Sequence, residues 1–274
     1  MSTPFSTLGI DAGATLCKLA LLRGEQIHTW QCASRDLDAA RAQVETLRPD
    51  RIVATGGGAA RLGSELVGVG VEIEGEFDAW ARGARELAAR EGIALPERYL
   101  LVSLGTGTSI LLLSAGKSER VGGSALGGGT LLGLGQLLLG TADFAEIAAL
   151  AARGDRRNVD LLVGDIYEGS EIPLSRDLNA SSFAKLASRK PEDIAHALIG
   201  LIGENLGLIC AHLAQVHGAT CVLYCGSTLT SNPALHAVLA NLGRMTSRNV
   251  AFLERGAFGG AVGAALKPDP RSRA

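Results

Sequence analysis

Short apolar runs separated by glycine-bearing turns open the chain. Three runs rich in strand-forming residues, at 6–11, 17–23 and 26–33, are joined by short turns and predict consecutive strands. A helix is expected to follow over about 36–47. A further apolar run at 51–55, which ends in three consecutive glycines, predicts a short buried strand.

The same kinds of element recur further along. Residues 77–90 are rich in alanine, and their apolar positions lie about 3.6 residues apart, which predicts a helix. Two apolar runs at 99–104 and 109–114 predict another strand pair. The stretch 92–97, which contains Pro96, separates these two groups, and we expect the chain to pass there from one domain to the next.

The resulting halves, 1–97 and 98–274, share a local pattern. In the first, Asp11-Ala-Gly-Ala-Thr15 precedes an apolar strand that runs to Gly24. In the second, Leu104-Gly-Thr-Gly-Thr108 precedes an apolar strand that runs to Gly116. Two such turns, about 93 residues apart, predict a duplicated domain with two hairpins that face phosphate.

A long apolar helix is predicted in the second half. Pro191 suits its first turn, Glu192 and Asp193 complement the positive end of the helix dipole, and Gly218 can end it. About 26 residues would span roughly 39 Å. Apolar positions occupy most of its circumference, so the helix is either the centre of a core or partly covered by a second subunit.

Composition narrows the class of protein. The chain has 274 residues, of which 47% are hydrophobic and 20% charged, so it can bury the cores of two globular domains. The formal net charge is −2, with no cluster of Lys or Arg, and we expect neither a nucleic-acid partner nor a membrane-surface partner.

The five cysteines show no metal spacing and indicate a reducing compartment, which predicts a cytoplasmic protein. The N-terminus does not resemble a signal peptide, and the apolar region 130–152 is interrupted by glycine and polar residues.

Three segments are candidates for phosphate chemistry. In Asp11-Ala-Gly-Ala-Thr-Leu-Cys-Lys18, small residues would leave backbone N–H groups facing phosphate, Asp11 could hold Mg2+ through water, and Lys18 could neutralise charge. In Gly105-Thr-Gly-Thr-Ser109, the glycines would permit close backbone approach and the hydroxyl groups could donate to phosphate. Gly122-Gly-Ser-Ala-Leu-Gly-Gly-Gly-Thr130 runs into an apolar helix at 131–139, and a glycine-rich loop that opens a helix favours an anion. An ordinary turn remains the alternative for the first two segments.

Other nucleotide and metal motifs are excluded. Ser114-Ala-Gly-Lys-Ser118 resembles the end of a P-loop, but the first glycine that this motif requires falls at Leu111. No GxGxxG run follows the first strand, and His212 and His217 lack zinc spacing.

The motifs together resemble the type II pantothenate kinases. The segments that carry the resemblance are Asp11 to Lys18, Glu76-Phe-Asp-Ala79, Gly105 to Ser109, Arg120-Val-Gly-Gly-Ser-Ala-Leu-Gly-Gly-Gly-Thr130, Gly154-Asp-Arg-Arg-Asn158, Tyr224-Cys-Gly-Ser-Thr228 and Gly256-Ala-Phe-Gly-Gly-Ala261. The resemblance covers about residues 8–266. It implies a duplicated, actin-like (ribonuclease H-like) α/β fold with mixed sheets and a cleft between two lobes. The wider superfamily includes sugar kinases, actin and heat-shock chaperones.

The resemblance also implies an activity and a set of site residues. It implies ATP-dependent phosphorylation of pantothenate at its primary hydroxyl, the entry step of coenzyme A synthesis, with Mg2+ and a homodimer built partly through the long helix. Glu76 falls on the family's catalytic carboxylate, although Glu74, Glu76 and Asp78 are all candidates on chemistry alone. Arg120 falls on the arginine that grips the pantothenate carboxylate. The implied nucleotide residues are Asp11, Ala12, Gly13, Ala14, Thr15, Leu16, Cys17, Lys18, Thr106, Gly128, Gly129, Thr130, Leu131, Leu132, Phe144 and Ser227. Direct metal ligands are not identified.

The chain departs from the family pattern at three positions. Ala14 replaces a frequent glycine, Phe144 stands where some members have Tyr, and Ser103 stands where some have Asn. Two other functions stay open: a kinase of the same superfamily that acts on an amino sugar or polyol, and an ATP-binding regulator without catalysis. Release of ADP over a panel of acceptors separates them.

Overall fold

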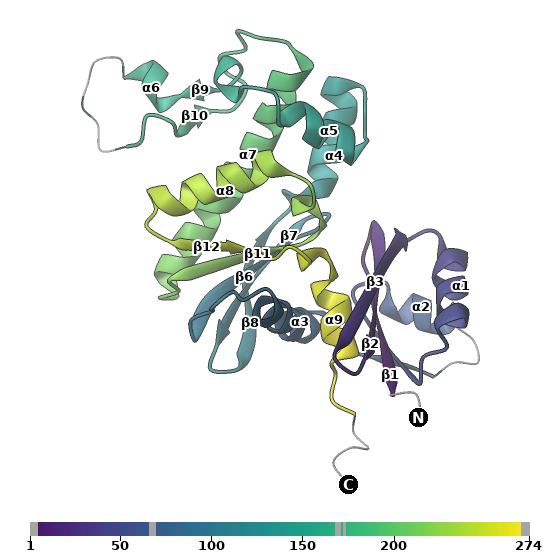
Figure 1. Cartoon of the computed structure of the whole chain (residues 1–274). Coiled ribbons are helices and arrows are strands. Elements are labelled where there is room, and N and C mark those ends of the chain that lie inside the picture. The colour runs from purple at the N-terminus through teal and green to yellow at the C-terminus, as the bar shows by residue number, and fades with distance from the viewer. Residues whose placement is uncertain (1–4, 66–69, 168–170, 172–173, 270–274) are drawn as a thin grey trace. The chain divides into compact units, whose positions relative to one another are not determined.

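The structure is a computed structural model, and its contacts divide the chain into two units (Figure 1). The residues that it describes are 5–65, 70–167, 171 and 174–269. Unit 1 comprises residues 1–97, 111–120 and 253–274, and unit 2 comprises residues 98–110 and 121–252.

Unit 1 contains a five-stranded mixed sheet in the order β3-β2-β1-β4-β5. Its strands are β1 (Ser6–Ala12), β2 (Leu16–Arg23), β3 (Gln26–Ala33), β4 (Arg51–Thr55) and β5 (Val71–Ile73). The first three strands are antiparallel neighbours, whereas β4 runs parallel to β1 and β5 runs parallel to β4. The carboxyl ends of β1 and β4 therefore lie side by side.

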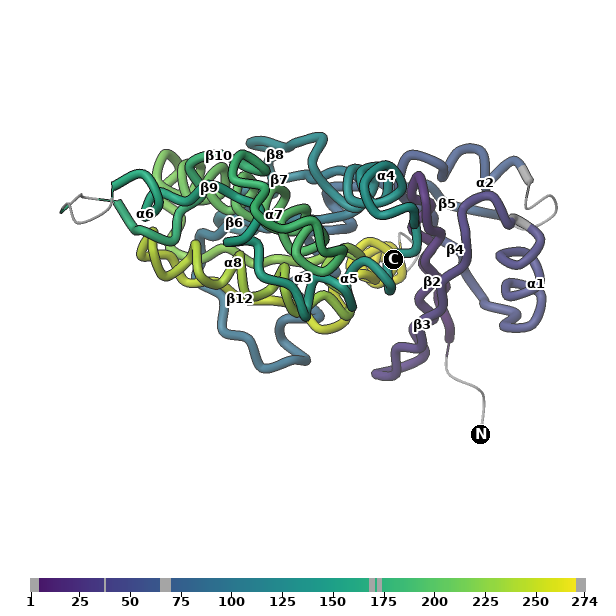
Figure 2. Tube along the Cα trace, turned by 90° about the horizontal axis from the view of Figure 1, so that it is seen from above, coloured from purple at the N-terminus to yellow at the C-terminus, as the bar shows by residue number. Residues whose placement is uncertain are grey.

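Helices cover both faces of this sheet (Figures 1 and 2). They are α1 (Leu37–Leu47), α2 (Ala59–Glu65), α3 (Glu76–Arg90) and α9 (Gly259–Ala265), which follows the short η3 (Gly256–Phe258). Because strand side chains alternate between faces, Ile10 and Ala12 join the core under α1 and α2, whereas Gly9 and Asp11 face α9.

Glycines bring α9 into backbone contact with its neighbours. A Cβ at Gly9 of β1 would overlap the Ala261 carbonyl, and one at Gly83 of α3 would overlap the Gly259 carbonyl. A Cβ at Gly263 would overlap the carbonyl of Ala79. The last helix of the chain thus fills a space between β1 and α3 that only glycine backbone leaves open.

A second five-stranded sheet, which includes residues 111–120 of unit 1 and otherwise belongs to unit 2, repeats the pattern in the order β12-β11-β6-β7-β8. Its strands are β6 (Arg98–Leu104), β7 (Thr108–Ser114), β8 (Lys117–Ser124), β11 (Cys221–Cys225) and β12 (Asn249–Phe252). As in unit 1, three consecutive strands are followed by two that are added in parallel. The predicted duplicated α/β fold with mixed sheets is confirmed.

The other elements of unit 2 surround a central helix. They are α4 (Gly128–Leu139), α5 (Phe144–Ala151), η1 (Arg156–Asn158), β9 (Leu161–Leu162), α6 (Val163–Ile166), β10 (Asn179–Ser181), α7 (Pro191–Val216), η2 (Ser227–Leu229) and α8 (Pro233–Met245). Helix α7 packs against α4, α5 and α8. Its 26 residues match the predicted extent.

Helix α7 also carries a buried ion pair. Arg156 donates to Glu204 at 2.7 Å, and its guanidinium lies 3.7 Å from Asp160. Gly200 leaves room for this arginine, because a Cβ there would lie 2.8 Å from its Cδ. By length and apolar composition alone α7 could cross a membrane, but 61% of its apolar window is buried within the protein.

The contact-based units differ from the two continuous segments expected from the sequence. The first long segment of unit 1 ends at Glu97, where the sequence places the crossing, but residues 111–120 and 253–274 also group with unit 1. Residues 253–274 group with unit 1 because α9 packs against β1 and α3, and in residues 111–120 the Ser118 hydroxyl bonds to Asp78 of α3. Strand β8 was also not anticipated, and it takes in Gly122 and Gly123 of the predicted glycine-rich loop.

Candidate active site

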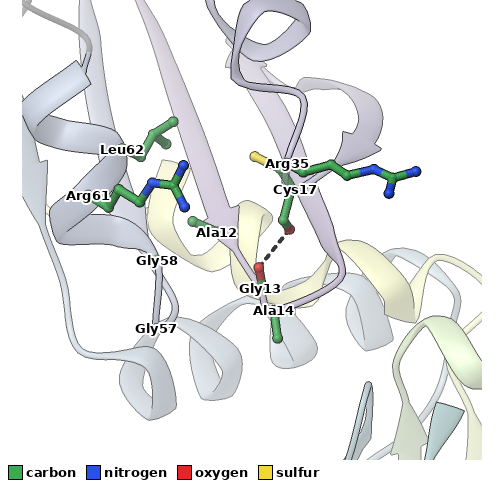
Figure 3. Close-up of a pocket in the computed structure, with 10 residues that line it drawn as sticks. Ala12, Gly13, Ala14, Cys17, Arg35, Gly57, Gly58, Arg61 and Leu62 are labelled. Carbon is green, nitrogen blue, oxygen red and sulfur yellow. Dashed lines mark hydrogen bonds between the residues drawn. The ribbon is translucent and has the colours of Figure 1, made fainter. Parts of the chain in front are cut away.

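The hairpin between β1 and β2 positions residues 11 to 18. The carbonyl groups of its turn are held by neighbours: Ala12 accepts from the Gly58 N–H at 2.9 Å, and Gly13 accepts from the Ser34 hydroxyl at 2.6 Å, drawn in Figure 3. Within the described residues, the N–H groups of Gly13 and Ala14 donate no hydrogen bond. Fixed carbonyls and available N–H groups are what a phosphate-binding turn requires.

The carboxyl group of Asp11 is buried at the end of β1. Its residue is 3% exposed and lies opposite Lys18 in the hairpin register. Burial raises the pKa of Asp11 from 3.8 to about 6, with Lys18 lowering it and Glu76 raising it. The nearby negative charge of Glu76 means that two carboxyl groups and one ammonium share this part of unit 1.

The structure distinguishes the three acidic residues near the start of α3. Glu74 is paired with Arg82 at 2.7 and 2.9 Å, and Asp78 accepts from the Ser118 hydroxyl at 3.0 Å. Glu76 is the exposed first residue of α3, and no hydrogen bond or ion pair to its carboxylate is found across the described ranges. A general base needs an accessible oxygen, so the structure favours Glu76 among the three.

Arg120 lies in β8, close along the strand to that same region. Ser118, which contacts Asp78, attaches β8 to the first turn of α3. Side chains two residues apart in a strand share a face, so Arg120 is on the face of β8 that carries Ser118. Its guanidinium is exposed. The predicted base and the predicted carboxylate-binding arginine therefore both belong to unit 1, on α3 and on the first half of β8.

In unit 2, the turn between β6 and β7 is held by the start of α4. The Gly128 N–H donates to the Gly105 carbonyl at 2.8 Å, and the Gly129 N–H donates to the Thr106 carbonyl at 2.9 Å. A Cβ at Gly127 would lie 2.7 Å from the Thr106 carbonyl oxygen. These glycines are required by close backbone approach, so their role differs in part from the predicted one: two N–H groups expected to face phosphate hold the turn instead.

The segment after β11 completes this cluster of loops. Gly226 has φ 109°, and a Cβ there would overlap the Leu104 backbone at the end of β6. Thr228, which follows Ser227 in η2, donates its hydroxyl to the Gly105 carbonyl at 2.9 Å. Thr106, Gly128, Gly129 and the turn that carries Ser227 thus come together. The loop cluster of unit 2 is defined here as residues 105–107, 127–130 and 226–228.

The remaining predicted nucleotide residues lie on α4 and α5. Thr130, Leu131 and Leu132 follow Gly129 in the first turns of α4, and Leu131 is fully buried. Phe144 is the first residue of α5, after the Asp143 N-cap. Helices α4 and α5 are bent by 75° at the break between them.

A pocket of about 440 Å³ lies on the face of the unit 1 sheet opposite Asp11 (Figure 3). It is lined by Ala12, Gly13, Ala14, Cys17, Ser34, Arg35, Gly57, Gly58, Arg61 and Leu62. Figure 3 shows the Arg61 guanidinium directed toward Ala12, while Arg35 extends away from the turn. The same hairpin thus has Asp11 on one side and this pocket on the other.

The described residues contain no group of three or more His, Cys, Asp or Glu side chains that could hold a metal ion. A protein cage for a metal is therefore not seen in this part of the chain. The buried carboxyl group of Asp11 fits Mg2+, which usually takes one or two carboxylates and completes its shell with water and phosphate oxygens.

Sequence reasoning missed the residues that surround Asp11. A Cβ at Gly56 would lie 2.8 Å from Asp11 Oδ1, and one at Gly260 would lie 2.6 Å from Asp11 Oδ2 and 3.1 Å from Trp80 Nε1. Both glycines stand in glycine-rich segments of the sequence, which was the available signal. Their proximity to Asp11 depends on tertiary packing.

Comparisons with known proteins show the family of the chain. The family model described as Fumble matches residues 91–267. A type II pantothenate kinase of Oceanobacillus iheyensis is 35% identical over 262 residues, which cover 94% of this chain and 98% of that relative.

Solved structures share the fold at low sequence identity. Component A of the (R)-2-hydroxyglutaryl-CoA dehydratase of Acidaminococcus fermentans superposes with a TM-score of 0.64 at 17% identity, covering 98% of this chain and all of that one. A ROK family glucokinase from Streptomyces griseus, in complex with glucose and AMPPNP, gives a TM-score of 0.61 at 16% identity, covering 95% and 98% of the two chains. At this identity the likeness establishes the actin-like fold.

Proposed function

We infer that this chain, which belongs to the Fumble family of type II pantothenate kinases, transfers the γ-phosphoryl group of ATP to the primary hydroxyl of pantothenate. The product is 4'-phosphopantothenate, and the reaction is the first step of coenzyme A synthesis. The observation that carries the proposal is the start of α3, where Glu76 is the one acidic residue of three whose carboxylate is left without a protein partner across the described ranges.

Glu76 is the proposed general base. Its carboxylate accepts the proton of the pantothenate hydroxyl as the oxygen attacks the γ-phosphorus, and the bond from that phosphorus to the β,γ-bridging oxygen breaks to release ADP. A positioned base contributes about 10²–10⁴-fold to the rate. The partners of Glu74 and Asp78 keep those carboxylates in structural contacts and leave the proton transfer to Glu76.

Arg120 is the proposed ligand of the pantothenate carboxylate. Its guanidinium can make two parallel hydrogen bonds to a carboxylate, a geometry that Lys does not reproduce. Ser118 supports this role, because its bond to Asp78 keeps β8 beside the first turn of α3. The hydroxyl end of pantothenate is thereby assigned to Glu76 of α3, and its carboxylate end to Arg120 of the neighbouring strand β8.

For ATP, each unit supplies its own set of contacts. In unit 1 the N–H groups of Gly13 and Ala14 are proposed to bind phosphate oxygens, and Lys18 to neutralise their charge. In unit 2 the loop cluster supplies Thr106 and Ser227, and we retain Gly128 to Leu132 and Phe144 as nucleotide residues. The availability of the unit 1 N–H groups supports this assignment.

Mg2+ is proposed as the accompanying ion, with Asp11 holding it through water. When bound, the ion would neutralise phosphate charge and so favour phosphoryl transfer. A buried carboxyl group with a raised pKa is suited to a nearby cation, because ionisation is costly there without one.

The proposal also includes a cytoplasmic homodimer. All five cysteines are free thiols, which suits a reducing compartment. Leu208 and Val216 of α7 are 45% and 65% exposed, and a second subunit would cover such positions. Sedimentation of the purified protein tests the dimer.

The test is an acceptor panel with ADP detection, run on the parent protein and on Glu76→Gln. The parent should release ADP with pantothenate, and Glu76→Gln should lower kcat by about 10²–10⁴-fold while ATP binding, measured by calorimetry, persists. Asp78→Asn, on the same turn of α3, is the matched control and should keep most of the activity. Equal turnover by Glu76→Gln and the parent would remove Glu76 as the base.

The same panel separates the other functions. An amino sugar or polyol that is active where pantothenate is inert would assign a different acceptor. ATP binding without ADP release on any acceptor would indicate a regulator. Arg120→Ala should raise the KM for pantothenate at least about tenfold, and an unchanged KM would remove Arg120 from the acceptor site.

A further inference from the structure

We propose that Gly260, in the last helix of the chain, is a positioning residue for Asp11. The lack of a side chain at position 260 sets where the Asp11 carboxylate lies. The inference rests on the proposed function, because it concerns the phosphate hairpin of the same kinase site, and it adds a residue outside the hairpin to that site.

The geometry comes from two glycines that face the two carboxylate oxygens. A Cβ at Gly260 would lie 2.6 Å from Asp11 Oδ2 and 2.9 Å from Asp11 Cγ. A Cβ at Gly56 would lie 2.8 Å from Asp11 Oδ1. Each distance is shorter than a carbon–oxygen or carbon–carbon contact tolerates. Each oxygen therefore rests against bare glycine backbone.

Packing, rather than hydrogen bonding, holds this carboxylate. Among the residues that the structure describes, no hydrogen bond or ion pair to Asp11 Oδ1 or Oδ2 is found, and the residue is 3% exposed. The terminal torsion of an aspartate side chain has broad energy wells, so the bond itself does not fix the orientation of the oxygens. The orientation of the oxygens is fixed by the backbone at positions 56 and 260, against which they pack.

Trp80 closes the space behind Gly260. Its Nε1 would lie 3.1 Å from a Cβ at position 260, and the Trp80 ring is buried against Gly259. An added methyl group would stand between the indole and the carboxylate, and the side chain with fewer contacts would move. Asp11 has no bond to lose, so it is the group that shifts.

Position 260 is also the cleaner of the two sites to alter. Gly56 has φ 87°, so any side chain there strains the backbone. Gly260 lies in α9 outside the left-handed region, and alanine adopts that conformation readily. Gly259→Ala is the matched control: its Cβ would meet the Trp80 ring at 2.8 Å and does not reach Asp11.

The experiment compares Gly260→Ala, Gly259→Ala and Asp11→Asn in the full-length protein. We expect Gly260→Ala to lower kcat at least about tenfold relative to Gly259→Ala, since a displacement of about 1 Å at a reacting group can cost about 10²-fold. The KM for pantothenate should stay within about twofold. Thermal unfolding should be shifted similarly in the two glycine variants.

A binding readout accompanies the kinetics. The chain has two tryptophans, so Trp30→Phe leaves Trp80 as the one tryptophan emitter beside the site. The Trp80 fluorescence of the Trp30→Phe protein is titrated with ATP, once with Mg2+ and once without it. The ratio of the two dissociation constants gives the gain in ATP affinity that the ion provides. Gly260→Ala should reduce that gain to the level of Asp11→Asn, and Gly259→Ala should retain it.

The outcomes separate the inference from the proposed function. A parent protein that is inactive on pantothenate contradicts the proposed function, and the ATP titration still decides the role of Gly260. An active parent whose two glycine variants have kcat values within twofold of each other, with the same Mg2+-dependent gain, overturns the inference. Equal losses in both glycine variants also overturn it, because disturbed packing of α9 would then explain the effect.

Discussion

Replacement of Asp11 by Asn should stabilise the protein at neutral pH while it impairs the reaction. Burial raises the pKa of Asp11 from 3.8 to about 6, so the folded state disfavours the charged carboxylate. This change corresponds to about 3 kcal/mol of folding free energy. The cost is fully present above about pH 6 and disappears as the pH falls from about 6 to 4, because protonated Asp11 is neutral in the fold.

The pH dependence isolates this effect from the other consequences of the substitution. The Asn amide has its own burial cost, but that cost is the same at every pH. The quantity to measure is therefore the Tm of Asp11→Asn minus the Tm of the parent. For a chain of this length about 2 °C corresponds to 1 kcal/mol, so the difference should grow by about 6 °C between pH 4 and pH 7.

Scanning calorimetry without nucleotide or Mg2+ is the appropriate assay, since a bound cation would favour the ionised form. A Tm difference that stays constant from pH 4 to pH 7 would show that the carboxylate is not desolvated in the fold. A difference that shrinks as the pH rises would show that ionised Asp11 is stabilised by its surroundings. Either result would refute the reasoning.

Two further predictions concern packing. Arg156→Met should lower the free energy of unfolding, measured by urea titration, by about 3–5 kcal/mol, because Glu204 and Asp160 would remain as buried charges without their cation. A loss under 1 kcal/mol would contradict this prediction. Gly263→Ala should cost about 3 kcal/mol by overlap with the Ala79 carbonyl, whereas Gly133→Ala, which meets nothing within 4 Å, should be neutral or stabilising. Equal stability of the two glycine variants would contradict the packing.

The local elements could be read from the sequence because their signals are local. Helix α7 begins at Pro191, and its 26 residues were expected from its capping residues and apolar spacing. The hairpin around Gly13 followed from alternating runs and a small-residue turn. In β8 the signal failed, because Gly122 and Gly123 suggest a loop while pairing with β7 makes them a strand.

The sequence could predict which motifs belong to the candidate site, but it could not predict most of the contacts that their residues make. The resemblance singled out Glu76, and the structure adds a reason through the partners of Glu74 and Asp78. The sequence could not show that the Gly128 N–H bonds to the Gly105 carbonyl, because a glycine at the start of a helix is equally compatible with anion binding and with close packing. Gly260 could not be connected with Asp11, because that contact is made by opposite ends of the chain.

The placement of α9 has a consequence for how the protein is made. Synthesis runs from the N-terminus, and domains generally fold as they emerge. In this protein β1 lacks its packing partner until α9 has been synthesised, because the surface of β1 around Gly9 stays uncovered until residues 259–265 leave the ribosome. A truncation that removes this helix would therefore leave the earliest part of the molecule unfinished, and loss of the final turns should be felt at the phosphate hairpin rather than at the C-terminus.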